Sequence, residues 1–437
     1  MTTTARRLDV PQPARFDGAV PAPSPARGWD PLLICIAVYV AAAVGRIHDL
    51  FPVLAVFKPA LTAGTLAIAL YLLQRSRVRR MQRVRSRTAV CLLGLVLWSA
   101  LSVPGALNQG TAFQSWTELC RTAAISFVIA ASVRSVRDVE RVALVYFGVT
   151  VVYAIVVLAR FQLDAESWRL GRLYYYDAND FATLVVTAMP LGLYFVLAKR
   201  RPVVRAAALA GLALLAVCLI RSGSRGGFLA FLVVAAFVLM RVTTIPARSR
   251  LAGLVLILAV LSATASDQYW AQMQTIVRPK QDYNLTSEEG RLKVWKRGLD
   301  YMSAHPVFGV GANNFPVAEG TISPLARLAE RGIGVRWGAA HNSYVQVAAE
   351  LGIPGFVLFV ALLWSAFASL RRAALRRRGG STRPPTDELS RLAQTLMAAF
   401  IGFAVGALFL SLAYTDMLYT LVAMAMGLAK TARWDVT

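Results

Sequence analysis

The polar side chains best suited to chemistry lie in connectors between long apolar stretches. Arg221 and Arg225 flank a glycine-containing turn, and a guanidinium group matches the oxygens of a phosphate or pyrophosphate. Arg291 lies near the expected start of a helix, where backbone N–H groups and the helix dipole also favour an anion. His341 carries an imidazole, which can accept a proton near neutral pH. These residues predict a site for a phosphorylated group with one general base.

Three further polar residues are weaker candidates for binding a substrate. Asn342 and Tyr344 follow His341 directly, and Asn179 follows a run of three tyrosines whose rings could stack on sugars. Each candidate also has an ordinary interpretation. Tyrosines collect at membrane interfaces, arginines pair with lipid phosphates, and a single histidine is often a packed interfacial residue. The sequence therefore leaves both interpretations open.

The composition indicates that most of the chain is embedded in lipid. Apolar residues make up 57% of the 437 residues and charged residues only 16%, which is more apolar surface than a soluble chain of this length can bury. The net charge of +24 is concentrated in runs between the apolar stretches. This distribution is the positive-inside pattern of membrane proteins, with anionic lipids and not nucleic acid as the partner.

Twelve apolar stretches alternate with polar connectors. They cover approximately 32–45, 55–74, 89–105, 117–133, 142–159, 181–198, 205–220, 226–240, 249–264, 352–370, 392–413 and 416–429. With the N-terminus inside, every strongly basic connector falls on the cytoplasmic side. We therefore expect an all-α polytopic membrane protein with about 12 transmembrane helices and one long helical extracytoplasmic loop.

The expected organisation along the chain follows from this layout. It comprises a disordered cytoplasmic tail at 1–30, transmembrane helices 1–9 at 31–264, a large extracytoplasmic loop with site residues at 265–351, transmembrane helices 10–12 at 352–429, and a cytoplasmic tail at 430–437. Within the loop, Thr286 and Glu289 have capping-box spacing, which predicts a helix that starts near Ser287. Leu292, Trp295, Leu299 and Met302 then share one face of that helix.

Several kinds of chemistry lack their sequence signals. The chain contains no phosphate-binding loop, no dinucleotide fingerprint and no paired-aspartate motif. The four cysteines lie in or beside apolar stretches and the three histidines are scattered, so we expect no metal and no cofactor. An extracytoplasmic site also has no access to cytoplasmic nucleotides. Any activated donor must therefore be anchored in the membrane.

Five motifs together resemble the O-antigen ligase and O-antigen polymerase superfamily of bacterial inner-membrane proteins. The motifs are the turn Ser224-Arg225-Gly226, then Arg291-x-x-x-Trp295 followed by Pro306-Val307-Phe308-Gly309-Val310-Gly311, then His341-Asn342-Ser343-Tyr344, and finally Gly352-Ile353-Pro354-Gly355. Asn179 also resembles the asparagine that precedes the sixth span in that superfamily. These motifs do not separate ligases from polymerases.

The resemblance implies a metal-independent glycosyltransferase of lipopolysaccharide or polysaccharide biosynthesis, with its site facing the periplasm. The donor would be a glycan on undecaprenyl pyrophosphate and the acceptor a sugar hydroxyl of lipid A–core. By the same resemblance, His341 would be the general base, while Arg225 and Arg291 would hold the pyrophosphate. Arg221 and Asn342 are weaker assignments to that site.

Two alternatives stay open at this level, the first within the same class of function and the second from another class. A polymerase of O-antigen or exopolysaccharide, or a protein O-glycosyltransferase, would use the same site with a different acceptor. A membrane transporter is the second alternative, although its charged residues would be expected midway through the spans and not in an outer loop.

Overall fold

The computed structural model describes residues 28–161, 168–170, 175–197, 202–278, 287, 290–326, 338–375 and 388–434. These residues form helices and no strands. The helices are α1 (Pro31–Ala43), α2 (Ile47–Leu50), η1 (Pro52–Phe57), α3 (Pro59–Leu72), α4 (Arg77–Val84), α5 (Arg87–Ser102), α6 (Gln109–Ser132), α7 (Val136–Phe161), α8 (Ala178–Leu197), α9 (Pro202–Ser222), α10 (Arg225–Arg241), α11 (Ala247–Thr264), α12 (Asp267–Gln274), α14 (Arg291–Ala304), α15 (Phe315–Thr321), α16 (Ser343–Leu375), α17 (Glu388–Gly406) and α18 (Asp416–Trp434). Residues 1–27 of the expected N-terminal tail lie outside the described part.

Each of the twelve expected spans overlaps a helix, but fewer helices are long and apolar enough to cross a bilayer. Seven described helices meet that condition, or eight if α4 and α5, bent by 94°, count as one span. α1 has 13 residues and α10 has 17, and at 1.5 Å per residue both fall short of the roughly 30 Å hydrocarbon core. The fold is therefore all-α and polytopic, while the expected count of twelve spans is not confirmed.

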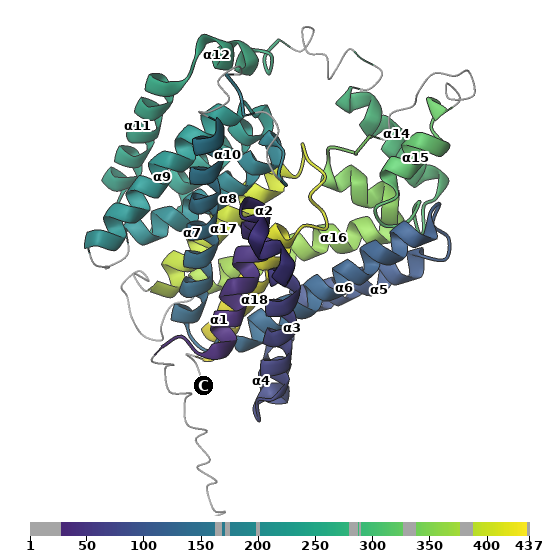
Figure 1. Ribbon diagram of the computed structural model, residues 1–437, viewed down its shortest axis with the longest axis horizontal. Coiled ribbons are helices and arrows are strands. Elements are labelled where there is room, and N and C mark those ends of the chain that lie inside the picture. Colours follow the sequence, from purple (N-terminus) through teal and green to yellow (C-terminus); the bar gives the residue numbers. More distant parts are fainter. Residues whose placement is uncertain are drawn as a thin grey trace, which may run out of the picture.

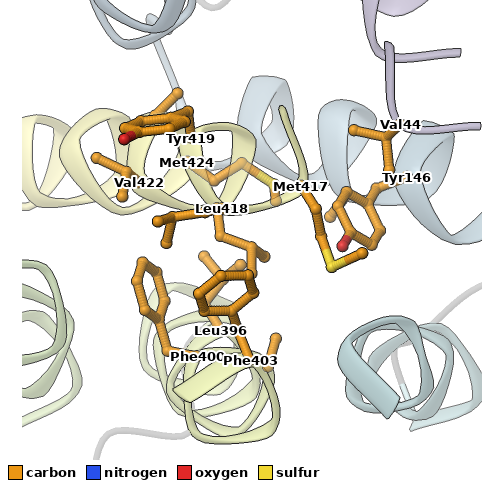
Figure 2. Packing of buried hydrophobic residues seen from close by; sticks show 14 of the residues in the cluster. Val44, Tyr146, Leu396, Phe400, Phe403, Met417, Leu418, Tyr419, Val422 and Met424 are labelled. Atoms are coloured by element: carbon orange, nitrogen blue, oxygen red, sulfur yellow. The ribbon is translucent and has the colours of Figure 1, made fainter. Parts of the chain in front are cut away.

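The helices differ in how deeply they lie within the bundle. In the spanning windows of α8 and α17, 78% of the residues are buried, whereas the window of α11 has none. Figure 2 shows Leu396, Phe400 and Phe403 of α17 beneath Leu418 of α18, with all four side chains buried. Dispersion and hydrophobic contacts of this kind fix the centre of the bundle. α11 instead lies at the periphery (Figure 1).

The end of α17 differs from the expected span at 392–413. The helix stops at Gly406, and residues 407–415 are not helical before α18 begins at Asp416. Gly406 packs so closely on Thr183 of α8 that an added Cβ would lie 2.6 Å from its side-chain atoms. The apolar composition of 407–413 predicts helix, but its backbone carbonyls are used by another helix, α16. Tertiary hydrogen bonds therefore replace the helix here.

Two glycine motifs meet where α16 bends. Gly352 interrupts the helix with φ +67°, and Ile353 donates its N–H to the carbonyl of Pro306 at 2.8 Å. A Cβ at Gly352 would overlap the carbonyl oxygen of Val307, and one at Gly309 would overlap the backbone of Glu350. Only glycine allows this approach at positive φ. The motifs at 306–311 and 352–355 therefore clamp the outer segment onto α16.

The helix in the outer segment differs from its predicted form. α14 begins at Arg291 with Gly290 as N-cap, four residues after the expected start near Ser287; Thr286 and Glu289 lie outside the described residues. Its buried residues are Val294, Arg297, Gly298 and Tyr301, whereas Leu292 and Leu299 are exposed. The predicted apolar face is therefore not the buried face of α14, and an ion pair of Arg297 anchors this helix.

The two kinds of connector occupy opposite ends of the bundle. α12, α14 and α15 lie toward the top of Figure 1, and the basic helix α4 lies at the bottom. α18 packs against α4 and continues to Trp434, and the Lys430 ammonium is buried, donating to the carbonyls of Ala130 and Ala131 at 2.7 and 2.8 Å. Lys430 is therefore part of the helical bundle and not the first residue of a tail.

Candidate active site

The turn between α9 and α10 brings the start of α10 against two neighbouring segments. Gly223 has φ +56°, and the Ser224 hydroxyl accepts the N–H of Gly227 at 3.1 Å, capping α10. An added Cβ at Gly226 would lie 3.0 Å from Phe409. One at Gly227 would lie 2.6 Å from Ala182 of α8. The glycines thus allow the end of the helix that carries positive partial charge to approach the loop at 407–412.

Arg169 joins this turn to the start of α8. Its Nε donates to the carbonyl of Ser222 at 2.7 Å and its Nη2 to the side-chain oxygen of Asn179 at 3.3 Å. The neighbouring Leu170 donates its N–H to the carbonyl of Arg221 at 2.7 Å. Asn179 and the arginine turn are therefore neighbours, as a shared site requires. Sequence reasoning missed Arg169, although an arginine beside a tryptophan in an outer connector is a usable signal.

The two arginines of the turn are half-buried, and one has a defined partner. Arg225 donates Nη1–H to the hydroxyl of Thr275, the C-cap of α12, at 2.6 Å. Arg221 is the last but one residue of α9. Ile220, the residue before Arg221, packs against Tyr269 and Met273 of α12, so the turn lies beside that helix. Thr275 fixes the direction of the Arg225 guanidinium, because a hydrogen-bonded planar fork has few orientations.

His341 lies in a turn that is held by the loop at 407–412. Its backbone has φ +48°, and its N–H donates to the hydroxyl of Ser411 at 2.9 Å. Ser343 bonds to the same loop twice. Its N–H donates to the carbonyl of Ala407 at 2.8 Å, and its hydroxyl donates to the carbonyl of Leu410 at 2.7 Å. A left-handed conformation in a histidine is unfavourable and persists only where surrounding contacts hold it. Such strain is typical of functional sites.

Asn342 and Tyr344 have structural contacts that also position His341. The Asn342 side-chain oxygen accepts the N–H groups of Tyr344 and Val345 at 2.9 and 3.1 Å, which caps α16. The Tyr344 hydroxyl donates to the carbonyl of Ala404 in α17 at 3.0 Å. These hydrogen bonds occupy the Asn342 side-chain oxygen and the Tyr344 hydroxyl, two groups that were expected to bind a substrate. The structure gives both residues a role in fixing the turn that carries the imidazole.

The motif Arg291-x-x-x-Trp295 connects α14 to the same turn. The Trp295 indole donates to the carbonyl of Ala340, directly before His341, at 3.1 Å. Arg291 lies one helical turn earlier, so its side chain emerges on the same face of α14. Gly298 packs so closely on Phe315 and Val345 that any larger residue would collide with them. These close contacts of Gly298 therefore fix the position of α14 against α16.

A buried ion pair holds α14 to α15. Arg297 donates from Nε and Nη2 to the Glu319 carboxylate at 2.9 and 2.5 Å, and the Tyr301 hydroxyl donates to the same carboxylate at 2.7 Å. The hydrogen bond to Glu319 raises the pKa of Arg297. Burial, then the bond to Glu319, raises the pKa of Tyr301. Arg297 and Tyr301 therefore keep their protons, and the ion pair with Glu319 holds α14 to α15.

The loop at 407–412 is the meeting point of the site. Gly226, next to Arg225, packs on Phe409, and His341 bonds to Ser411. Phe409 and Ser411 are two residues apart, so their Cα atoms lie within about 7 Å. Arg291 lies one helical turn before Trp295, whose indole bonds to Ala340 directly before His341. The structure thus brings the predicted base and the predicted anion-binding turn to one loop, from helices far apart in the sequence.

The described residues include no group of three or more histidine, cysteine, aspartate or glutamate side chains placed to hold a metal ion. All four cysteines are free thiols. Arginines, helix-capping hydroxyls and one imidazole define the site. This arrangement can bind an anionic group and exchange a proton.

The fold and site define a multi-span helical membrane protein with an arginine- and histidine-containing site at one end of the bundle. In a comparison with known families, the family described as O-antigen ligase matches residues 210–360, about a third of the chain. This match supports the assignment of the chain to the O-antigen ligase superfamily, whose members are glycosyltransferase-like ligases and polymerases. The matched segment contains Arg221, Arg225, Arg291 and His341, and Asn179 precedes it. No curated protein matches the chain.

Proposed function

We propose that the protein transfers a glycan from undecaprenyl pyrophosphate to a sugar hydroxyl of lipid A–core, on the periplasmic face of the bacterial inner membrane. His341 is the general base of this reaction. Arg225 and Arg291 bind the pyrophosphate, with Arg221 beside them and Asn179 next to the turn. The reaction uses no metal and no cofactor.

The chemistry follows from these roles. The acceptor oxygen attacks the anomeric carbon of the donor sugar while its proton passes to the His341 imidazole. The bond between the anomeric carbon and the pyrophosphate oxygen breaks, and its electron pair leaves with the diphosphate. Guanidinium groups fixed before the reaction stabilise that growing negative charge without reorganising. Attack from the face opposite the leaving group inverts the configuration of the anomeric carbon.

The observation that carries the proposal is the common loop at 407–412. It holds the backbone of His341 through Ser411 and contacts the start of α10, beside Arg225, through Phe409. A base and an anion-binding helix end on one loop suit a reaction in which proton removal and leaving-group departure occur at neighbouring atoms.

The test is transfer by the purified full-length chain reconstituted with undecaprenyl-pyrophosphate glycan and lipid A–core. His341→Asn removes the base yet tolerates the left-handed backbone, because asparagine adopts that region more readily than most residues. We expect it to abolish transfer, while His305→Asn, at an exposed histidine at the end of α14, leaves transfer unchanged. Full activity of His341→Asn would exclude the general-base role.

A second variant tests the anion-binding role. Arg225→Lys keeps the charge but loses the planar fork that binds a pyrophosphate. Its transfer rate should fall by roughly 10²-fold, the usual cost of removing one stabilising contact to a developing oxyanion. Arg160→Lys, an exposed arginine at the end of α7, is the matched control. Equal rates for the two variants would remove Arg225 from the site.

The family match leaves the acceptor open, because both ligases and polymerases belong to this superfamily. The same reconstituted chain is therefore offered lipid A–core, a second lipid-linked repeat unit or an acceptor protein in separate reactions. Product with lipid A–core alone supports the ligase. Product with the repeat unit alone would make the protein a polymerase, and product with the protein acceptor an O-glycosyltransferase.

A further inference from the structure

A cavity lies away from the candidate site, among the helices α8, α9, α10 and α11. Its volume is about 370 Å³, and its walls include Pro190 of α8, Leu212 of α9, Phe231 of α10 and Ile257 of α11. This volume is within the range of about 300–1,000 Å³ typical of ligand pockets. Nearly every lining side chain is apolar. The occupant must therefore be largely hydrocarbon.

The exceptions to the apolar lining are Ser249 and the charged Arg250, which are adjacent at the start of α11. The Nη1 of Arg250 donates to the carbonyl of Leu239, near the end of α10, and its Nε is buried with no hydrogen-bond partner within the described ranges. A buried guanidinium N–H without an acceptor is costly, and such a group normally meets a phosphate or carboxylate. The cavity thus combines a long apolar space with one unsatisfied cationic donor.

The surroundings of Arg250 are strongly basic. Four more arginines lie at the same ends of these helices and of α17: Arg205, Arg241, Arg248 and Arg391. Arg205 and Arg391 donate to the carbonyls of Val196 and Leu197 at the end of α8. Within the described residues of these helix ends, 196–197, 202–205, 238–250 and 388–391, Glu388 is the one acidic side chain. The field at this end therefore attracts an anionic head group.

We propose that this cavity binds one anionic phospholipid, with an acyl chain between α8 and α11 and its phosphate at Arg250. The lipid replaces protein contacts that α11 lacks, since no residue in the spanning window of that helix is buried. The bound lipid belongs to the leaflet on the side of the basic connectors, which the charge pattern assigns to the cytoplasm. It is a structural lipid and not a substrate.

The position of Arg250 separates this lipid from the proposed donor. Arg225 begins α10 and Leu239, which accepts from Arg250, lies fourteen residues later in the same helix. At 1.5 Å per residue, the two arginines are separated by about 20 Å along the helix axis. A pyrophosphate bound at Arg225 therefore cannot reach Arg250. A phosphate at Arg250 needs a second lipid.

The test uses the purified full-length chain in nanodiscs that contain equal amounts of phosphatidylglycerol and phosphatidylcholine, followed by native mass spectrometry. We expect one phosphatidylglycerol retained per chain in preference to phosphatidylcholine. Arg250→Ala should reduce that preference at least fivefold and Arg250→Lys should keep most of it. The matched control is Arg248→Ala, an exposed arginine on the same helix that does not line the cavity.

A variant that fills the cavity supplies the second measurement. Gly253 lines the cavity, and a Cβ added there meets no atom within 4 Å, so Gly253→Phe extends into open space. It should block retention of either phospholipid, whereas Gly148→Phe, equally unhindered on α7, should not. Equal retention of both lipids by the unmodified chain would overturn the proposal. So would equal effects of Arg250→Ala and Arg248→Ala, or a retained polyprenyl lipid that Gly253→Phe displaces.

Discussion

The Trp295→Phe substitution isolates the contact that joins α14 to the turn of His341. Phenylalanine keeps the aromatic packing but cannot donate to the carbonyl of Ala340, which lies directly before His341. Ala340 is 1% exposed, so water cannot easily replace the indole. Leaving a buried carbonyl unsatisfied costs about 1–3 kcal/mol. That free energy favours arrangements of the turn in which the carbonyl reaches water.

The expected consequence is a smaller population of the active arrangement. Each 1.4 kcal/mol corresponds to a factor of ten, so the transfer rate of Trp295→Phe should fall by about 5- to 100-fold. The fall should be in kcat, with the KM for the lipid-linked donor little changed, because the substitution removes no donor contact. The measurement is initial rate against donor concentration in the reconstituted transfer assay.

Trp98→Phe is a matched control. The Trp98 indole donates to the carbonyl of Leu351 at 3.0 Å, and Leu351 is fully buried. This bond holds the opposite end of the first part of α16, and phenylalanine can keep the stacking of Trp98 on Phe308. The control should lower the unfolding temperature by a similar amount but leave kcat nearly unchanged. Equal kcat losses in both variants would refute a specific link between Trp295 and His341.

Three further outcomes follow from the contacts. Glu319→Gln leaves the buried Arg297 charge without its carboxylate partner, and should lower the free energy of unfolding by about 3–5 kcal/mol. The measurement is denaturation in detergent, and an unchanged midpoint would show that the ion pair is solvated. Gly352→Ala should prevent folding, because its Cβ meets a carbonyl oxygen at φ +67°, whereas Gly105→Ala, with no atom within 4 Å of an added Cβ, should purify normally by size-exclusion chromatography. Burial lowers the pKa of His48 in the folded chain, so the unfolded chain takes up this proton more readily; its contribution to stability is complete above about pH 6.5 and is lost as the pH falls further. His48→Gln should therefore reduce the drop in unfolding temperature between pH 7.5 and 5.5, and an identical drop would contradict this.

Part of the candidate site could be found from sequence because local chemistry marks it. The turn of Arg221 and Arg225 was predicted from its glycines, and the structure places it between α9 and α10. The connection between Arg291 and His341 followed only from a family resemblance. Arg169, which links Asn179 to Ser222, was not predicted at all. The adjacent tryptophan marks Arg169 as a candidate, but its partners lie 53 and 10 positions away, and no local pattern identifies them.

The outer segment shows a second limit of local patterns. Leu292 and Leu299 were expected to share one face of α14; both are exposed, and the buried face of the helix is a different one. The face is set by Arg297, whose partner Glu319 lies 22 positions away. A charged residue counts as solvent-facing in any periodicity analysis, because its burial is favourable only when a partner is already in place.

The amino-acid sequence alone determined that the chain is helical, that it resides in a membrane, and where the long apolar helices lie, because hydropathy and turn residues act over short distances. Only the tertiary structure decided that the apolar segment 407–413 is a loop, and that its backbone and Ser411 hold His341. A helix satisfies its own hydrogen bonds, so apolar composition favours it until another segment offers equivalent partners. Here Ser343, more than sixty positions earlier, offers them.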